Sequence, residues 1–219
     1  MTEPSVQRAD RGAFAWSRIG SLLAVVPLGV WTVKHVWDNL SAFRGGEAWE
    51  AAVTKDPHPG TQIAVAVFVI LPLLIHTVWG VGRLLGARPN NLRYGYYANL
   101  KYLLQRLSAI GVALFLGAHL WLAWIRPRFV EGHAETFADI SFEMRFHGPT
   151  LLVYVLGTLG VAYHLGNGLS GFAMGWGIAR SRRGLRHVEP VALAVFLVLL
   201  AMSWSAIYAL YRAGASSTG

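Results

Sequence analysis

Four of the eight histidines stand inside long apolar segments of this 219-residue sequence, one in each of four segments: His35, His76, His119 and His164. Ionisable groups are costly in such surroundings, so they are usually kept there for a function. A neutral imidazole is also a good ligand for iron and other transition metals. One such histidine could merely form a hydrogen bond between helices, but four of them, on separate segments, favour a metal or cofactor site.

The segments that carry these histidines are long enough to cross a membrane. A hydrocarbon core about 30 Å thick needs roughly 20 helical residues. Four runs without Asp, Glu, Lys or Arg have about this length or more: 57–82, 107–125, 146–179 and 190–211. A fifth run, 19–33, extends to about residue 40 if Lys34 and Asp38 reach the interface or a polar interior. We therefore predict an all-α integral membrane bundle of five transmembrane helices, at about 16–40, 61–85, 101–126, 149–178 and 190–211.

The composition agrees with this fold class. With 54% apolar and 14% charged residues and a mean hydropathy of +0.43, the chain is too apolar for a soluble or a disordered protein. The sequence has no cysteine, which excludes disulfides, thiolate zinc sites, cysteine-ligated iron–sulfur clusters and covalently attached c-type haem. Any metal must therefore be bound by histidine, methionine or carboxylate ligands.

The basic residues predict an orientation. If the amino terminus lies inside, the inner segments hold 12 Lys and Arg and the outer segments hold 6. This excess predicts a cytoplasmic amino terminus in a multi-pass protein of the cell inner membrane. Topology and contact with membrane lipids thus account for the net charge of +8, and we expect no nucleic acid partner.

We expect three parts along the chain. They are a cytoplasmic amino-terminal segment at 1–15, a transmembrane domain at 16–211 and a short outer carboxy-terminal tail at 212–219. Glu3 and Asp10, with no small-residue cleavage site after the apolar run, favour a retained first helix over a cleaved signal peptide.

A rise of about 1.5 Å per helical residue places the four histidines at two depths. His35 and His119 lie roughly 24 Å and 20 Å from the inner side. The second and fourth helices run the opposite way, and their histidines, His76 and His164, lie roughly 21 Å and 22 Å from the outer side. Haem iron takes one axial ligand on each face of the ring, and imidazole suits it. We therefore predict two b-type haems, an inner one between His76 and His164 and an outer one between His35 and His119.

Other residues are candidates for contacts with these groups. Gly80 and Gly168 each follow a histidine by four residues, on the same helix face, which admits a flat ring close to the backbone, although small residues also serve helix packing. Haem propionates are anionic and need hydrogen-bond donors. Four residues at the inner ends of the first and third helices either hold the propionates of the inner haem or anchor the helix ends: Arg18, Ser21, Arg106 and Ser108.

Four stretches carry a family resemblance. They are LLAVVPLGVWTVKH ending at His35, LPLLIHTVWGV around His76, LKYLLQRLSAIGV with HLW at His119, and HLGNGLSGFAMGWGI starting at His164. They resemble the dihaem cytochrome b (b558-type) membrane anchor subunits of succinate dehydrogenases and quinol:fumarate reductases, of the five-helix single-subunit type. The resemblance covers roughly residues 16–210 and maps the four axial histidines of that family onto the same four positions.

The resemblance implies an assembly. An FAD-containing flavoprotein would oxidise succinate, and an iron–sulfur subunit would pass the electrons through the two haems of this chain to a quinone, usually menaquinone, near the outer haem. The chain would then be non-catalytic for succinate by itself but would contribute to the quinone site. Asp38, Glu47 and Glu50 lie near that face and either handle quinone protons or are solvated loop charges.

One departure from the family pattern concerns protons. Some fumarate reductases of this family carry a buried acid just before the histidine of the fourth helix, where this chain has Ala162 and Tyr163. We therefore expect electrons to cross without a compensating proton pathway in that helix, so that turnover responds to the membrane potential.

Two alternatives stay open at this point. One is a dihaem cytochrome b anchor of a fumarate reductase or of another membrane dehydrogenase, which shares the chemistry but has different partners. The other is a haem-free transporter or scaffold whose histidines form hydrogen bonds between helices.

Overall fold

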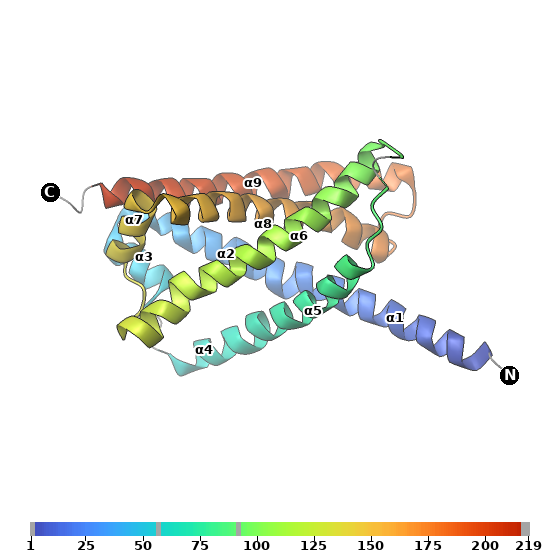
Figure 1. Ribbon diagram of the computed structural model, residues 1–219, viewed down its shortest axis with the longest axis horizontal. Helices are drawn as coiled ribbons and strands as arrows, with labels where there is room; N and C mark the ends of the chain where they lie inside the picture. Colours follow the sequence, from blue (N-terminus) through green and yellow to red (C-terminus); the bar gives the residue numbers. More distant parts are fainter. Residues whose placement is uncertain (1–2, 56–57, 91–92, 216–219) are drawn as a thin grey trace.

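Five long helical spans lie side by side in the computed structural model, which describes residues 3–55, 58–90 and 93–215 (Figure 1). Each span is long and apolar enough to cross a membrane, and no strand occurs in this described part of the chain. The spans are Gly12–Arg44, Pro59–Leu85, Tyr97–Glu131, Gly148–Gly175 and Arg182–Gly214. The predicted all-α bundle of five transmembrane helices is thus confirmed, whereas the orientation in the membrane stays a prediction.

The first three spans are built from several helical pieces. The first consists of α1 (Glu3–Leu23), a π-helical turn (Ala24–Gly29), α2 (Val30–Asn39) and a 3₁₀ turn (Leu40–Arg44). The second consists of α4 (Pro59–Val65), a π-helical turn (Ala66–Ile70) and α5 (Leu71–Leu85). The third consists of α6 (Tyr97–Leu120) and two π-helical turns (Trp121–Ile125 and Pro127–Glu131). The fourth and fifth spans are the single helices α8 (Gly148–Gly175) and α9 (Arg182–Gly214).

Prolines account for the widened turns. Pro27 lies inside the π-helical turn of the first span. Pro72 stands two residues after the π-helical turn of the second span, and Pro127 stands two residues after the first π-helical turn of the third span. A proline has no N–H to donate, and its ring collides with the carbonyl four residues earlier in a regular helix. A π-helical turn moves that carbonyl aside while the span stays helical.

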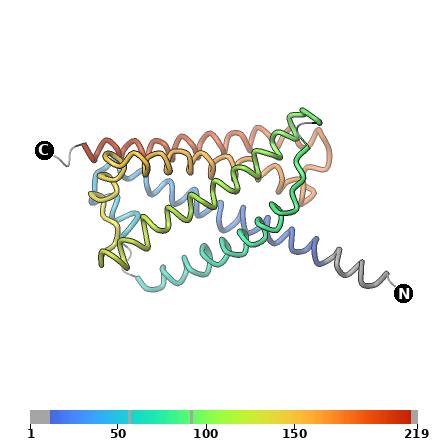
Figure 2. Tube along the Cα trace, viewed as in Figure 1, coloured from blue at the N-terminus to red at the C-terminus, as the bar shows by residue number. Residues whose placement is uncertain are grey.

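The spans pack together as one bundle, in which the first span contacts the fifth through α2 and α9. α8 packs against both α6 and α9, and α5 packs against α1; α8 and α9 run next to each other along their length (Figure 2). At Gly166 on α8, an added Cβ would lie 2.8 Å from the carbonyl oxygen of Ala192 and 2.7 Å from Cβ of Phe196, both on α9. The backbones of α8 and α9 therefore touch through a glycine, as is common between membrane helices.

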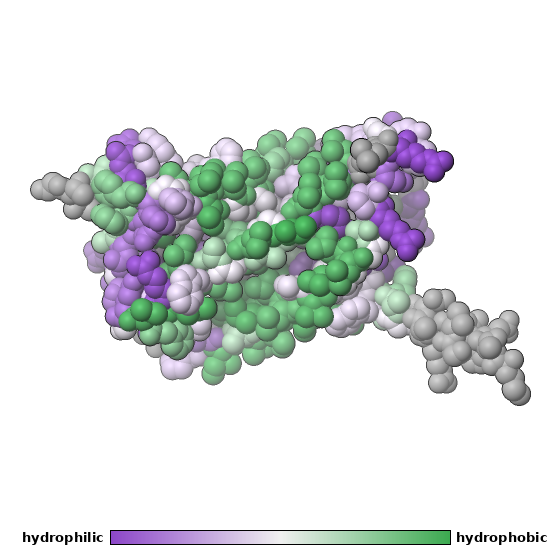
Figure 3. Space-filling view, in the orientation of Figure 1, coloured by the Kyte–Doolittle hydropathy of each residue, from purple (hydrophilic) through white to green (hydrophobic). Residues whose placement is uncertain are grey.

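The surface matches a membrane protein. Hydrophobic residues fill the middle of the visible face, and hydrophilic residues gather at its two ends (Figure 3). Large apolar side chains on different spans are well exposed, among them Phe68, Val78 and Leu114. Because soluble proteins rarely expose so much continuous apolar surface, this band is the surface that faces lipid.

Some boundaries differ from the sequence predictions. α9 begins at Arg182, earlier than the predicted 190, because the hydroxyl of Ser181 accepts a hydrogen bond from the backbone N–H of Gly184 and caps the helix. Two short helices between spans, α3 (Gly46–Val53) and α7 (Phe137–Phe146), were not predicted. Of the predicted terminal parts, residues 1–2 and 216–219 lie outside the described residues.

Lys34 and Asp38, the two charged residues near the end of the first span, form an ion pair. The Nζ of Lys34 and Oδ2 of Asp38 are 2.5 Å apart, one helical turn from each other. The ion pair lets both charges stand within a membrane span at a reduced cost.

Candidate functional site

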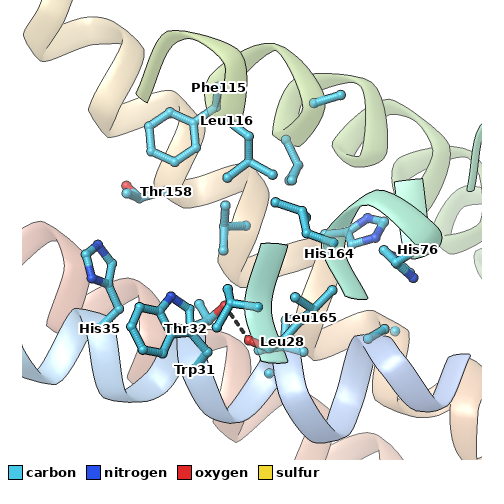
Figure 4. A pocket seen from close by; sticks show the side chains of 18 of the residues that line it. Leu28, Trp31, Thr32, His35, His76, Phe115, Leu116, Thr158, His164 and Leu165 are labelled. Carbon is cyan, nitrogen blue, oxygen red and sulfur yellow. Dashed lines mark hydrogen bonds between the residues drawn. The ribbon is translucent and has the colours of Figure 1, made fainter. Parts of the chain in front are cut away.

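The structure brings the four intramembrane histidines together in two pairs. The ring centroids of His35 and His119 are 5.9 Å apart, and those of His76 and His164 are 6.3 Å apart. The rings of each pair are steeply inclined, by 67° and 72°. Figure 4 shows His76 facing His164 in one part of a cavity and His35 in another. These are the two pairings that the depth argument predicts.

The spacing within each pair suits one metal atom between two imidazoles. An imidazole nitrogen binds a first-row metal at about 2.0–2.1 Å, so two such rings on opposite sides of the metal have centroids roughly 6 Å apart. A haem iron needs no more than these two protein ligands. Residues 3–55, 58–90 and 93–215 contain no cluster of three or more His, Asp or Glu residues suited to a bare metal ion. The two histidine pairs are therefore the candidate metal ligands in this part of the chain.

Neighbouring helices hold three of the histidine rings through Nδ1. The partner atoms are the carbonyl oxygen of Gly20 for His76 (3.0 Å) and the hydroxyl of Tyr154 for His119 (3.1 Å). Nδ1 of His164 has two neighbours, Nε2 of Gln105 at 3.2 Å and the hydroxyl of Ser108 at 3.3 Å. Metal-binding histidines usually donate the second ring N–H in this way, which fixes both the tautomer and the ring orientation. The carbonyl oxygen of Gly20 can only accept, so Nδ1 of His76 donates and its Nε2 is the nitrogen left for a metal.

The histidines line one large cavity. Its volume is about 1960 Å³, and residues of the first four spans contribute most of its wall. Pockets for a single small ligand are roughly 300–1,000 Å³. The cavity reaches from Arg18 and Arg106 at one end to Trp124 and Glu135 at the other, so it has room for two large flat groups, one at each histidine pair.

Glycines of the second and fourth spans fall into two kinds. Gly80 and Gly171 line the cavity, and a Cβ added to either one would meet no atom within 4 Å. A Cβ on Gly168 would meet only Nε2 of Gln105, at 3.7 Å. By contrast, a Cβ on Gly157 would collide with the ring of Phe115, so this glycine serves the packing of α8 on α6. The first kind leaves open space beside the histidines, which a flat ring can use.

Arg106 provides an independent sign of an anionic ligand. It lines the cavity, and its Nε is buried without a hydrogen-bond partner among the described residues. Its guanidinium carbon lies 4.6 Å from the ring centroid of Tyr102. An unpaired buried donor on a charged group is costly, and an anionic oxygen would satisfy it.

The other candidates for propionate contacts lie differently. Arg18 and Ser21 line the same end of the cavity, where the guanidinium carbon of Arg18 lies 5.1 Å from the ring centroid of Trp176. The hydroxyl of Ser21 accepts a hydrogen bond from Nε1 of Trp176 at 3.1 Å. Ser108 stands against Nδ1 of His164 instead, a position that suits support of the histidine better than contact with a propionate.

Two of the acidic candidates near the other end are already engaged. Asp38 pairs with Lys34, and Oε1 of Glu50 accepts the backbone N–H of Phe137 at 3.1 Å. Glu47 is exposed on α3.

Sequence reasoning missed two residues of this region. Tyr154, which contacts His119, is one of two tyrosines in the apolar helix α8, and no sequence signal distinguishes it. Glu135 is only 7% exposed, yet it lies in a polar stretch between two predicted helices, where burial is not expected from sequence.

Comparison with known proteins gives one clear relative. No family model matches the chain. The chain is 33% identical over 201 residues to the succinate dehydrogenase cytochrome b558 subunit of Bacillus subtilis (strain 168), and the match covers 90% of this chain and 96% of that protein.

Proposed function

Since the chain belongs to the family of succinate dehydrogenase cytochrome b558 subunits, we propose that it anchors a flavoprotein and an iron–sulfur subunit to the membrane and conducts electrons from succinate to a quinone. It is a multi-pass membrane protein, and the cytochrome b family implies haem b. The proposal that electrons pass through two haems is supported by the two histidine pairs, each at the spacing of a bis-imidazole site.

We assign one haem b to each pair, within a dihaem domain at 16–211. A bound haem b supplies an iron that accepts and gives up one electron at a time. The two imidazoles of each pair would hold the iron, and His76 would do so through Nε2. The carbonyl of Gly20 and the hydroxyl of Tyr154 keep the rings of His76 and His119 turned toward the cavity.

The charges around the cavity suit anionic propionates at the His76 and His164 end. Arg106 offers its unpaired Nε, and Arg18 adds a second guanidinium at the same end. Together they offset the negative charge of the propionates, which is otherwise expensive to bury.

The partners follow from membership of the succinate dehydrogenase family. The iron–sulfur clusters belong to a separate subunit, which docks on the cytoplasmic side, and the lack of cysteine in this chain agrees with that assignment. The flavoprotein that oxidises succinate docks on that subunit. The quinone, which we take to be menaquinone, binds at the end of the cavity near His35 and His119.

An optical difference spectrum of the purified complex tests the proposal. We expect two b-type α-band components that a redox titration separates. Replacing His76 or His164 with alanine removes one component, and replacing His35 or His119 removes the other. His187, which is exposed on α9, provides the control, because its replacement leaves both components unchanged.

Two results would contradict the proposal in different ways. A wild-type complex without a b-type band would exclude the haem sites and favour the alternative of a haem-free transporter or scaffold. Loss of the same component in variants from different pairs refutes the pairing alone.

A further inference from the structure

One carboxyl group of the cavity has no counter-ion. Three carboxylates line the cavity within the described residues: Asp38, Glu135 and Glu189. Asp38 pairs with Lys34 at 2.5 Å, and Glu189 pairs with Lys101 at 2.6 Å. Glu135 makes no hydrogen bond or ion pair with any residue that the structure describes, although the residue is only 7% exposed.

Glu135 stands between two hollows. It lines the large cavity, and it also lines a second hollow of about 190 Å³. The wall of this second hollow carries three further carboxylates, Glu131, Asp139 and Glu143. Glu135 directly precedes the capping residue of α7, which packs against α8, the helix that carries Tyr154. The residue therefore connects the His119 end of the cavity with an acidic hollow between the third and fourth spans.

The surroundings of Glu135 favour its protonated form near neutral pH. Burial, reinforced by the negative charges of Asp139 and Glu131, raises the pKa of Glu135 to about 7. Arg126 does not compensate, because its guanidinium is held by Glu131 at 2.8 Å and by Glu143 at 3.2 Å. The titratable and charged groups around Glu135 are Arg126 and Glu131 of the third span, His133 of the same turn, Asp139 and Glu143 of α7, and Tyr154 of α8.

Quinone reduction needs a group of this kind. A quinone that accepts two electrons must take up two protons to become a quinol, and the electrons arrive one at a time from succinate. Apolar side chains cannot carry these protons, so they arrive through a titratable side chain or a chain of water molecules. A carboxyl that titrates near pH 7 both releases and regains a proton readily.

We propose that Glu135 relays protons from the acidic hollow to a quinone bound beside His35 and His119. In each of two cycles the protonated carboxyl gives its proton to a reduced quinone oxygen and is reprotonated from the hollow. This inference rests on the proposed quinone-reducing function and names the residue that serves it.

The test uses the assembled complex with the substitution Glu135→Gln, which keeps the size of the side chain but cannot relay a proton. We expect the rate of quinone reduction by succinate at pH 7 to fall by about 10- to 100-fold. In the wild type, the rate falls as the pH rises through about 7, because the carboxyl loses its proton, whereas in the variant the rate does not change over that range. Reduction of a water-soluble dye at the flavoprotein and reduction of both haem bands by succinate stay unchanged.

A second readout does not depend on turnover. After anaerobic reduction by succinate, the b-type bands are reoxidised by a pulse of soluble menaquinone analogue, and we expect this reoxidation to slow in Glu135→Gln. The matched control is Glu189→Gln, which removes a carboxyl from the opposite end of the same cavity and keeps the pH profile of the wild type.

The outcomes are distinguishable. Wild-type rate and pH profile in Glu135→Gln, with both bands present, overturn the relay while leaving the proposed function intact. Absence of haem bands or of quinone reduction in the wild type overturns the proposed function instead. If Glu135→Gln does not assemble, Glu135→Asp takes its place. It keeps a carboxyl at a changed distance, so we expect a slower, still pH-dependent rate, and a profile identical to the wild type overturns the relay.

Discussion

We expect collapse of the membrane potential to weaken succinate-driven quinone reduction by this complex, because the two histidine pairs lie at different depths. On the first span, Gly20 contacts His76 and lies fifteen residues before His35, about 22 Å along the helix. On α8, Tyr154 contacts His119 and lies ten residues before His164, about 15 Å along the helix. The pairs are thus separated by roughly half to three quarters of a hydrocarbon core about 30 Å thick.

This separation sets the size of the effect. A full crossing is worth about 2.3 kcal/mol per charge per 100 mV, so the two electrons together gain about 2.3–3.4 kcal/mol from a potential of 100 mV. This corresponds to about 50- to 300-fold in the equilibrium constant. With the amino terminus in the cytoplasm, a potential that is negative inside drives electrons outward and favours quinone reduction.

Vesicles that contain the complex provide the assay. A potassium diffusion potential is imposed, and the fumarate-to-succinate ratio at which half of the quinone is reduced is measured with and without an uncoupler. We expect the uncoupler to lower that ratio by the factor above, while dye reduction at the flavoprotein does not change. A ratio that is the same at all potentials would refute the transmembrane arrangement of the two pairs.

Three further predictions concern single side chains. Tyr154→Phe removes the hydroxyl at Nδ1 of His119; we expect both haems to remain and the potential of one to rise by about 40 mV, the equivalent of about 1 kcal/mol for one electron, and an unchanged redox titration would contradict this. Gly166→Val pushes α8 away from α9, so it should destabilise the bundle by about 1–3 kcal/mol and lower the temperature of thermal unfolding. A side chain at Gly80 meets no protein atom, so Gly80→Val should remove one haem component without changing the unfolding of the cofactor-free chain. Equal effects of the two substitutions would show that the two glycines do not differ in role. Thr136→Ala removes the cap of α7 and should lower stability by about 1 kcal/mol, measured as the shift in thermal unfolding, and a variant as stable as the wild type would mean that packing alone holds α7.

The spans were predictable from sequence because the cost of a charge in hydrocarbon is large and acts residue by residue. Runs without charged residues therefore mark the helices well. Their ends are less predictable, since a helix continues past the apolar run when a cap and head-group contacts allow it. α9 does so, starting at Arg182 in a basic stretch after the capping residue Ser181.

The short helices outside the spans depend on other signals. The capping box of Thr136 and Asp139 is a recognisable start signal for α7. The helix persists because Ser141 and Met144 are completely buried, a tertiary contact that sequence does not reveal.

The candidate site was predictable only in part. The pairing of His35 with His119 and of His76 with His164 follows from depth, because helix rise is constant. Tyr154 and Glu135 were not predictable, because their roles depend on which side chains face each other across helices. One tyrosine or one glutamate in the sequence carries no such information.

The cavity also has a consequence for how the protein is assembled. α5 rests on α1 on one side and faces the cavity on another, so a chain without its prosthetic groups leaves this helix incompletely packed. A group that binds only the folded arrangement stabilises it in proportion to its affinity. Insertion of the cofactor and consolidation of the second span are therefore coupled, and a cell short of haem would accumulate a loosened chain that proteases can recognise.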